Sequence, residues 1–237
     1  MNLRLPLAAF VALALMGGVA HARGQLQARQ TSVDMPPGVR GGRLVLGNGG
    51  DSPVAAQIRI YAWTQDGDQD VLVPSNDLTV SPPVVEIAGG ADQLIRLVRN
   101  SEAAPRQELA YRVVVDELPG DPAASTQSAV NVRMRFLIPV FVRVADPAPV
   151  ALKCSLEAAV LACSNSGGVA AQLGASRLLS ADGRSLELTP GLMGYVLAGS
   201  SRRFTLETDK LGSAQGWKTL EVRLNGQPAS IELSSGR

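Results

Sequence analysis

The chain has 237 residues, 46% hydrophobic and 18% charged, which is enough apolar material for one or two packed domains. Its formal net charge is +1, so it lacks the global basic field that attracts nucleic acid, and we expect no nucleic-acid partner. The only histidine, His21, lies in a segment that we predict to be removed, which excludes triad chemistry and histidine-ligated metal sites from the mature chain.

The first 22 residues predict an export signal. Arg4 precedes a short apolar run from Leu5 to Val19, and Ala20-His21-Ala22 has the small-residue pattern of a cleavage site. The apolar run is too short to span a bilayer comfortably, and no later stretch is longer, so we expect no membrane insertion. We therefore predict a signal peptide at residues 1–22 and an exported chain that begins at residue 23.

Short alternating or apolar runs, separated by Gly, Pro, Asn and Asp, predict an all-β protein of the sandwich type. Within residues 54–63, Gln57 and Arg59 alternate with Ile58 and Ile60, as in a sheet with one buried face. The strands predicted for the first half are Gly42–Leu46, Val54–Trp63, Leu78–Ser81, Leu94–Arg99, Leu109–Leu118 and Val130–Val144.

Two prolines break this rhythm in the segment Ala145–Pro149, where they predict a stiff, extended connection between two domains. We place the boundary there, with domains at 23–145 and 146–237, each about the size of an immunoglobulin-like sandwich. The strands predicted for the second half are Val150–Leu156, Ala159–Ser164, Ser185–Leu188, Ser201–Leu206, Trp217–Leu224 and Ala229–Leu233.

Cys154 and Cys163 are the only cysteines, and an even pair in an exported chain predicts a disulfide. A tight turn near Glu157 and Ala158 would bring the two strands to cross-strand distance, where the bridge has a structural role. The spacing is not that of a redox C-x-x-C motif, and a metal site would lack a histidine ligand.

The run Asp66–Asp70 places carboxylates at alternate positions, as a calcium loop does, but Val71 stands where that loop needs glycine. A solvated hairpin turn is the better interpretation. The glycines between Gly38 and Gly50 are interpreted as turns, because no helix pattern follows them to hold a phosphate. With no nucleophile and base together, we expect no enzyme activity, no metal and no cofactor.

The segment Val130–Phe136 alternates apolar with polar residues, so that one strand face is apolar. Periodicity alone favours an ordinary strand of a sheet. The alternative is an exposed apolar edge that pairs with another chain by β-augmentation. The apolar positions are Val130, Val132, Met134 and Phe136.

At several places the sequence resembles the PapD-type periplasmic pilus chaperones of the chaperone-usher pathway. The segments at 111–119 and 135–142 are more similar to the branch that serves spore-coat-like pilins than to PapD itself. The segments that carry the resemblance are NGGDSPVAAQIRIYAW at 48–63, SPPVV at 81–85, QLIRLVR at 93–99, YRVVVDELP at 111–119 and RFLIPVFV at 135–142.

The resemblance implies two immunoglobulin-like β-sandwich domains in an L or boomerang arrangement, located in the periplasm. It further implies a chaperone that binds pilus subunits by donor-strand complementation and delivers them to an outer-membrane usher. The donor strand would present Val130, Val132, Met134 and Phe136 to an incomplete pilin fold, whose exposed core and unpaired backbone are costly in water.

The resemblance also assigns Glu108 and Arg143 to an ion pair near the domain junction, which would fix the interdomain angle. Family members anchor the subunit's terminal carboxylate with an Arg near the first strand and a Lys in the last strand of the first domain. Those positions hold Ser32 and Pro139 here. Since guanidinium groups bind carboxylates bidentately, the substitute candidates are Arg29, Arg112 and Arg135.

Two alternatives remain at this point. The first is an immunoglobulin-like structural adhesin or pilus component, but residues 23–30 are short and polar for the free N-terminal extension that such a subunit donates. The second is a carbohydrate-active enzyme on a sandwich scaffold. A free chaperone would also have reason to self-associate, because this covers its apolar edge.

Overall fold

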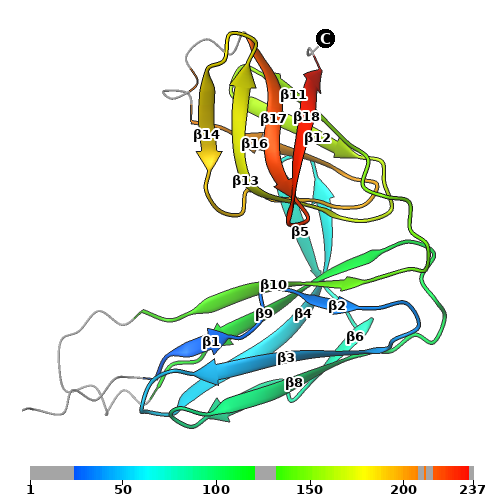
Figure 1. Cartoon of the computed structure of the whole chain (residues 1–237). Coiled ribbons are helices and arrows are strands. Elements are labelled where there is room, and N and C mark those ends of the chain that lie inside the picture. The colour runs from blue at the N-terminus through cyan, green and yellow to red at the C-terminus, as the bar shows by residue number, and fades with distance from the viewer. Residues whose placement is uncertain (1–23, 121–131, 208–210, 212–215, 235–237) are drawn as a thin grey trace, which may run out of the picture.

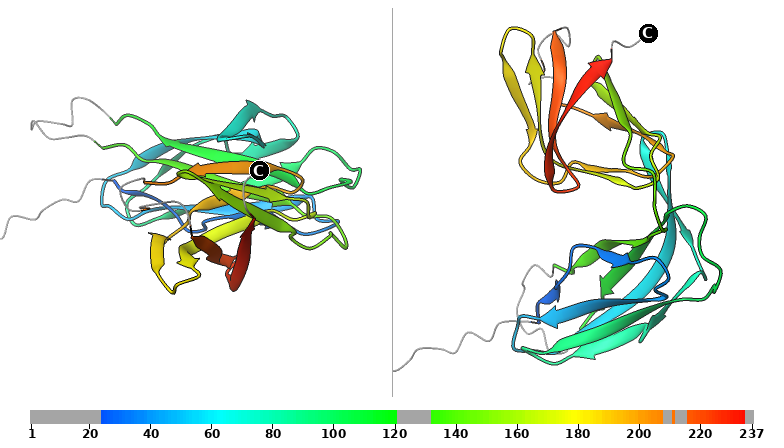
Figure 2. Two further views of the ribbon diagram at one scale, coloured as in Figure 1. Left: turned by 90° about the horizontal axis from the view of Figure 1, so that it is seen from above. Right: turned by 45° about the vertical axis from the view of Figure 1, so that its right-hand side comes forward.

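The computed structural model describes residues 24–120, 132–207, 211 and 216–234. Within these ranges the chain forms two β-sandwich lobes that meet at an angle, as Figures 1 and 2 show. We call the part built from β1–β10 the first lobe and the part built from β11–β18 the second lobe. The predicted all-β, two-unit, L-shaped architecture is confirmed, whereas the predicted signal peptide lies outside the described residues. No helix in the described ranges is long and apolar enough to cross a membrane.

The first lobe packs a four-stranded sheet, in the order β1-β3-β8-β6, against a second sheet in the order β2-β10-β9-β4-β5, to which β7 adds through β4. Alternate residues of both sheets point inward, and the core between them includes Leu44, Ile58, Ile95 and Val113, all fully buried. The strands are β1 (Leu26–Ala28), β2 (Val33–Met35), β3 (Gly41–Asn48), β4 (Val54–Asp66), β5 (Gln69–Pro74), β6 (Leu78–Ser81), β7 (Val84–Ile87), β8 (Asp92–Arg99), β9 (Leu109–Glu117) and β10 (Arg135–Val142).

The second lobe is one sheet in the order β14-β13-β17-β18-β11-β12-β16, with β15 on β13, folded over a separate core. The fold-over occurs at β18, which pairs with β17 along most of its length but with β11 at Leu233 and Ser234. The strands are β11 (Leu152–Glu157), β12 (Val160–Asn165), β13 (Ala171–Ser180), β14 (Ser185–Thr189), β15 (Gly194–Val196), β16 (Ser201–Thr205), β17 (Trp217–Leu224) and β18 (Gln227–Ser234).

A disulfide joins Cys154 to Cys163, as predicted. The two cysteines lie directly opposite each other in the β11–β12 hairpin, and their Cα atoms are 4.1 Å apart. The hairpin turns at Ala158, which has a φ of 50°. The residues Val160–Asn165 after it form β12, because they pair with β11 across the hairpin and with β16 on the other side.

A buried asparagine closes one end of each lobe in the same way. Asn48 accepts hydrogen bonds from the backbone N–H groups of Gln25 and Gly50 and donates to two carbonyls. Asn165 accepts from Ala151 and Gly167 and also donates to backbone carbonyls. Each side chain thus satisfies backbone groups that no strand partner reaches.

The last strand of the first lobe ends at Val142 and the first strand of the second lobe begins at Leu152. The boundary that we place at residues 145 and 146 falls in this connection. The predicted strands all have counterparts, but β13 and several short strands were missed: β1, β2, β5, β7 and β15. Edge strands of three to six residues are too short to show an alternation that differs from chance.

Candidate functional site

The strand β10 has one fully paired side and one partly open side. Against β9 it pairs along its whole length, from Arg135 opposite Asp116 to Val142 opposite Leu109. On the other side β2 covers only Val140–Val142, in parallel. Residues 135–139 therefore have no strand partner on that side among the described residues. β10 lies on the side of the first lobe that faces the second lobe (Figure 1).

Pro139 stands at the inner limit of this open edge. Because proline has no backbone N–H, it can donate no hydrogen bond to a neighbouring strand, and a proline inside a strand is tolerated where that strand is missing. An added strand would therefore pair with residues up to 138 and end where β2 begins. The open edge is thus bounded at one end by the protein's own chain.

The predicted donor positions differ in their exposure. Val132 is 72% exposed and Met134 is 40% exposed. Phe136 is partly buried and packs against the core of the first lobe, so its ring is committed to the protein's own sandwich. Leu137, on the opposite face, is 48% exposed. Val130 lies outside the described residues.

The predicted strand Val130–Val144 is longer than the strand that the structure shows, which begins at Arg135. Its partner β9 ends at Glu117, and the side chain of Glu117 accepts a hydrogen bond from the backbone N–H of Met134. The ladder stops because a side chain takes the place of the next backbone acceptor. The carbonyl of Met134 still accepts a hydrogen bond of 2.9 Å from the backbone N–H of Glu117, and residues 132 and 133 continue the edge beyond the described strand pairs.

The three arginines proposed as carboxylate anchors have different partners. Arg29 is exposed and donates two hydrogen bonds to Asp92. Arg135 is exposed and pairs with Asp116, which Arg59 also contacts. Burial alone would raise the pKa of the Asp116 carboxyl, but hydrogen bonds from these two arginines lower it. Both exposed candidates are therefore already engaged by close carboxylates.

Arg112 has a different environment, at the inner corner between the lobes. Its guanidinium lies over the ring of Trp63, with the central carbon 3.6 Å from the ring centroid, and its side chain is only 12% exposed. It donates one long hydrogen bond, of 3.3 Å, to the carbonyl of Leu137 on β10. Its nearest carboxylate, Asp70, is 3.8 Å away, beyond hydrogen-bond length.

Burial lowers the pKa of the Arg112 guanidinium, and the nearby Asp70 carboxylate opposes this effect. The group remains charged, because an arginine in a protein does not lose its proton. A buried guanidinium with few short hydrogen bonds has unused capacity to bind an anion. Among the three candidates, Arg112 alone combines that capacity with a position beside β10.

The structure brings Glu108 and Arg143 together in an ion pair at the junction. The Glu108 side chain is 2% exposed, and its other oxygen accepts a hydrogen bond of 2.8 Å from the backbone N–H of Ala170 in the second lobe. Arg143 also contacts Asp34 on β2. The Glu108 carboxylate, directly before β9, thus contacts both Arg143, directly after β10, and the backbone of the second lobe.

The β4–β5 hairpin also reaches the second lobe, as Figure 1 shows where β5 lies beside it. The Gln65 side-chain amide donates to the carbonyl of Tyr195 and accepts from the N–H of Leu197, as a neighbouring strand would do. At the hairpin turn, Asp68 pairs with Arg203 at 2.6 Å. This is the solvated turn expected from Asp66–Asp70, and the guanidinium of Arg203 holds it against the second lobe.

A small aromatic cluster fills the junction. Trp63 and Phe141 of the first lobe contact Tyr195 of the second lobe, and the ring of Tyr195 meets Trp63 edge-on at a centroid distance of 5.4 Å. Burial raises the pKa of the Tyr195 hydroxyl, so the ring stays neutral. The backbone contacts, the ion pairs and these rings together hold the lobes at a defined angle.

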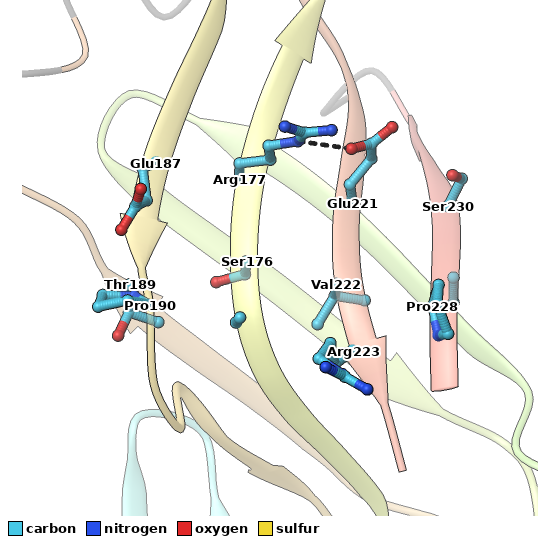
Figure 3. Close-up of a pocket in the computed structure, with 12 residues that line it drawn as sticks. Ser176, Arg177, Glu187, Thr189, Pro190, Glu221, Val222, Arg223, Pro228 and Ser230 are labelled. Carbon is cyan, nitrogen blue, oxygen red and sulfur yellow. Dashed lines mark hydrogen bonds and ion pairs between the residues drawn. The ribbon is translucent and has the colours of Figure 1, made fainter. Parts of the chain in front are cut away.

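A pocket in the second lobe lies away from this corner. Figure 3 shows that its walls come from β13, β14, β17 and β18, with Arg177 reaching across to Glu221. That pair is 2.6 Å apart, so two of the charged side chains that line the pocket already satisfy each other. None of the lining residues belongs to β10 or to the junction, and we assign no role to this pocket.

The first lobe can now be compared with known families. The family described as "Pili and flagellar-assembly chaperone, PapD N-terminal domain" matches residues 25–148, more than half of the chain. The chain belongs to this family. Pilus chaperones of this family are periplasmic proteins and are not enzymes, and the sequence resemblance to PapD-type chaperones is confirmed at this level. None of the curated proteins compared with this pilus chaperone matches it.

Solved structures of pilus chaperones share the fold of this family member. The CsuC–CsuE chaperone–tip subunit complex of Acinetobacter baumannii matches with 22% identity and a TM-score of 0.69, over 90% of this chain and 100% of that one. The SafB chaperone in complex with SafA pilin of Salmonella enterica matches with 17% identity and a TM-score of 0.64, over 90% and 99%. The E. coli chaperone DraB matches with 19% identity and a TM-score of 0.60, over 89% and 97%.

Sequence reasoning missed two residues of the corner in this chaperone. Asp70 appeared only as a turn residue, and Arg202 gave no signal, because nothing near it in the sequence distinguishes it from surface charge. In the structure both lie at the junction, and Arg202 is 3.8 Å from the Asp70 carboxylate. Only the packing of the lobes brings residues so distant in sequence together.

Proposed function

We propose that this pilus chaperone captures pilus subunits in the periplasm by lending them the open edge of β10. The observation that carries the proposal is that β10 pairs with β9 along its whole length, whereas on its other side residues 135–139 have no strand partner within the described ranges. This edge continues into the exposed Val132 and Met134. The protein thus offers, on one strand, both backbone groups and apolar side chains that a fold lacking one strand requires.

The physical basis is the cost of an incomplete sandwich. A subunit without its last strand exposes apolar core and an unpaired sheet edge to water, and both promote aggregation. The chaperone's donated segment, which leads into β10, would place the side chains of Val130, Val132 and Met134 in the subunit's core. Phe136, which packs into the chaperone's own core, supports the strand from beneath in this proposal.

We further propose that Arg112 anchors the subunit's terminal carboxylate at the corner. A strand that runs along the open edge of β10 toward Pro139 ends beside β2, and Arg112 faces Pro139 directly on β9. Arg112 would thereby fix the register of the added strand, because a carboxylate held by a guanidinium sets where the chain stops. It takes the place of the family's anchor positions, which hold Ser32 and Pro139.

Delivery of the captured subunit to an outer-membrane usher completes the proposed function. The support is family membership together with a fold that two solved chaperone–subunit complexes share. The domain boundary at residues 145 and 146, the 1–22 signal peptide and export to the periplasm belong to the same proposal. The Glu108–Arg143 pair would hold the angle at which the two lobes receive the subunit.

Co-expression with a pilin subunit of the source organism tests the donor edge. Val132→Asp and Met134→Asp place a charge in the subunit's apolar core, so we expect loss of the soluble complex on co-purification. Val39→Asp is a matched control, because Val39 is similarly exposed, at 45%, but lies in the loop between β2 and β3. An intact complex with both edge variants would show that β10 is not the donor strand.

A further inference from the structure

The corner between the lobes contains two arginines that share one carboxylate. Arg112 comes from β9 of the first lobe and Arg202 from β16 of the second lobe. Asp70 on β5 lies between them, with one carboxylate oxygen 3.8 Å from Arg112 Nη2 and the other 3.8 Å from Arg202 Nη1. Both separations fall within ion-pair range but outside the range of a hydrogen bond.

The corner also holds hydrogen-bond donors that have no acceptor. The Nη1 atom of Arg202 and the Nε1 atom of Trp63 are buried and have no hydrogen-bond partner among the described residues. Side-chain donors removed from water without an acceptor cost free energy, and a buried cation costs more than a neutral group. Of these two donors, Arg202 Nη1 lies near the Asp70 carboxylate, and Trp63 Nε1 belongs to the ring that Arg112 covers.

The neighbouring ion pairs show that closer contacts are possible at this junction. Asp68, two residues before Asp70 on the same hairpin, binds Arg203 through hydrogen bonds of 2.6 and 3.0 Å. Arg143 is likewise in close contact with Asp34 and Glu108. Asp70 therefore differs from the other carboxylates in that it bridges two guanidinium groups without closely binding either.

We infer that Arg112 and Arg202 form a carboxylate-binding site completed by both lobes, and that Asp70 occupies this site until a ligand carboxylate displaces it. The Asp70 side chain is 35% exposed, and one of its oxygens accepts a hydrogen bond of 3.0 Å from the Gln65 side-chain amide. On turning outward it would exchange this one hydrogen bond for water, where its charge is solvated. An incoming carboxylate with two free oxygens would approach each guanidinium to hydrogen-bond distance. Bound there, it would join the first lobe to the second.

This inference rests on the proposed function in one respect, namely that the natural ligand is the terminal carboxylate of a bound subunit. It adds Arg202 of the second lobe to the proposed anchor and predicts how Asp70 affects carboxylate binding. As an internal competitor, Asp70 weakens carboxylate binding. A purely structural bridge would have the opposite sign, because its removal would loosen the corner and weaken binding.

A fluorescence titration separates these two roles without any subunit. The chain has two tryptophans, so Trp217→Phe leaves Trp63 as the only reporter, directly beneath Arg112. N-acetylglycine serves as the carboxylate probe, and N-acetylglycinamide at the same ionic strength serves as its uncharged match. We expect a saturable change in emission with the acid and none with the amide.

The variants then assign the roles. We expect Asp70→Asn to raise the affinity for N-acetylglycine about fivefold, with Asp70→Ser as a second variant, and Arg202→Gln to lower it about tenfold. The matched controls Asp68→Asn and Arg203→Gln, from the adjacent pair, should stay within about twofold. Weaker or unchanged binding by both Asp70 variants, equal losses for Arg202→Gln and Arg203→Gln, or no response to the acid would each overturn the inference.

The outcome is independent of subunit capture. A normal titration in a protein that captures no pilin would contradict the proposed function and leave the two-lobed site in place. Normal pilin capture by a protein that does not respond to the acid would overturn the site and leave the donor edge in place.

Discussion

Arg112 lies over the indole ring of Trp63, and this contact places a buried cation at the point where the open edge of β10 meets the second lobe. A cation–π contact uses none of the N–H groups of the guanidinium as hydrogen-bond donors, so these remain available to an anion. The tryptophan is in turn fixed by Phe141 and Tyr195. A rigid aromatic base thus orients the proposed anchor before any subunit arrives.

Replacement of Arg112 should weaken subunit binding through the terminal carboxylate. A charge-assisted hydrogen bond contributes about 1.5–3 kcal/mol, so we expect Arg112→Gln to raise the dissociation constant roughly 10- to 100-fold. Isothermal titration with a pilin subunit measures the loss. The same subunit with a C-terminal amide should bind Arg112→Gln and the unmodified chain with similar affinity.

Arg29→Gln and Arg135→Gln are controls for that prediction, since Asp92 and Asp116 already engage these side chains. We expect both to bind the subunit within about twofold of the unmodified chain. A large, carboxylate-dependent loss in one of these two variants, with normal binding by Arg112→Gln, would move the anchor to that residue.

Removal of the Glu108 carboxylate should loosen the junction between the lobes. Glu108→Ala leaves the Ala170 N–H without its acceptor and deprives Arg143 of its buried partner, which we expect to cost roughly 1–3 kcal/mol. Urea unfolding measures the free energy, and small-angle X-ray scattering measures the spread of interlobe distances, which should widen.

Asp34→Asn is the matched control for the junction, because Asp34 contacts the same arginine but is half-exposed. We expect it to change the free energy of unfolding by only about 0–1 kcal/mol. An equal loss for both variants would indicate that Glu108 acts only as a surface charge.

The Asp116 carboxylate should make stability depend on acid pH. Burial favours a higher pKa, but hydrogen bonds from Arg59 and Arg135 set the folded-state pKa below the ordinary value of 3.8. The carboxylate therefore stabilises the fold at pH values above 3.8, and this contribution is lost as the pH falls through the lower, folded-state pKa.

Urea unfolding from about pH 7 to pH 3 checks this dependence. The difference in free energy of unfolding between the unmodified chain and Asp116→Asn should be constant near neutral pH and shrink in acid. In a chain that already carries Arg59→Gln and Arg135→Gln, only burial acts strongly on this carboxyl and favours a raised pKa, so the acid loss of stability caused by Asp116 should disappear or reverse in sign. A difference that grows in acid would contradict the assignment.

Much of the architecture could be predicted because it depends on local patterns. The alternation in Val54–Trp63 lies within a single strand, and Cys154 and Cys163 pair across one short hairpin. The donor edge itself stays a prediction, and the burial of its side chains could not be predicted from alternation. Alternation placed Phe136 in one row with Val132 and Met134. In the structure the ring of Phe136 packs against the core of the first lobe, whereas the side chains of Val132 and Met134 are exposed.

The sequence by itself determined the all-β class, the two sandwiches, the disulfide and the resemblance to pilus chaperones, because strand period, turn residues and motif order are written along the chain. Only the tertiary structure decided which arginine keeps unused donors, and that Asp70 and Arg202 share its corner. The reason is that hydrogen-bond capacity depends on which partners come within reach. At this junction, the partners of Arg112 come from strands far apart in the sequence and from both lobes.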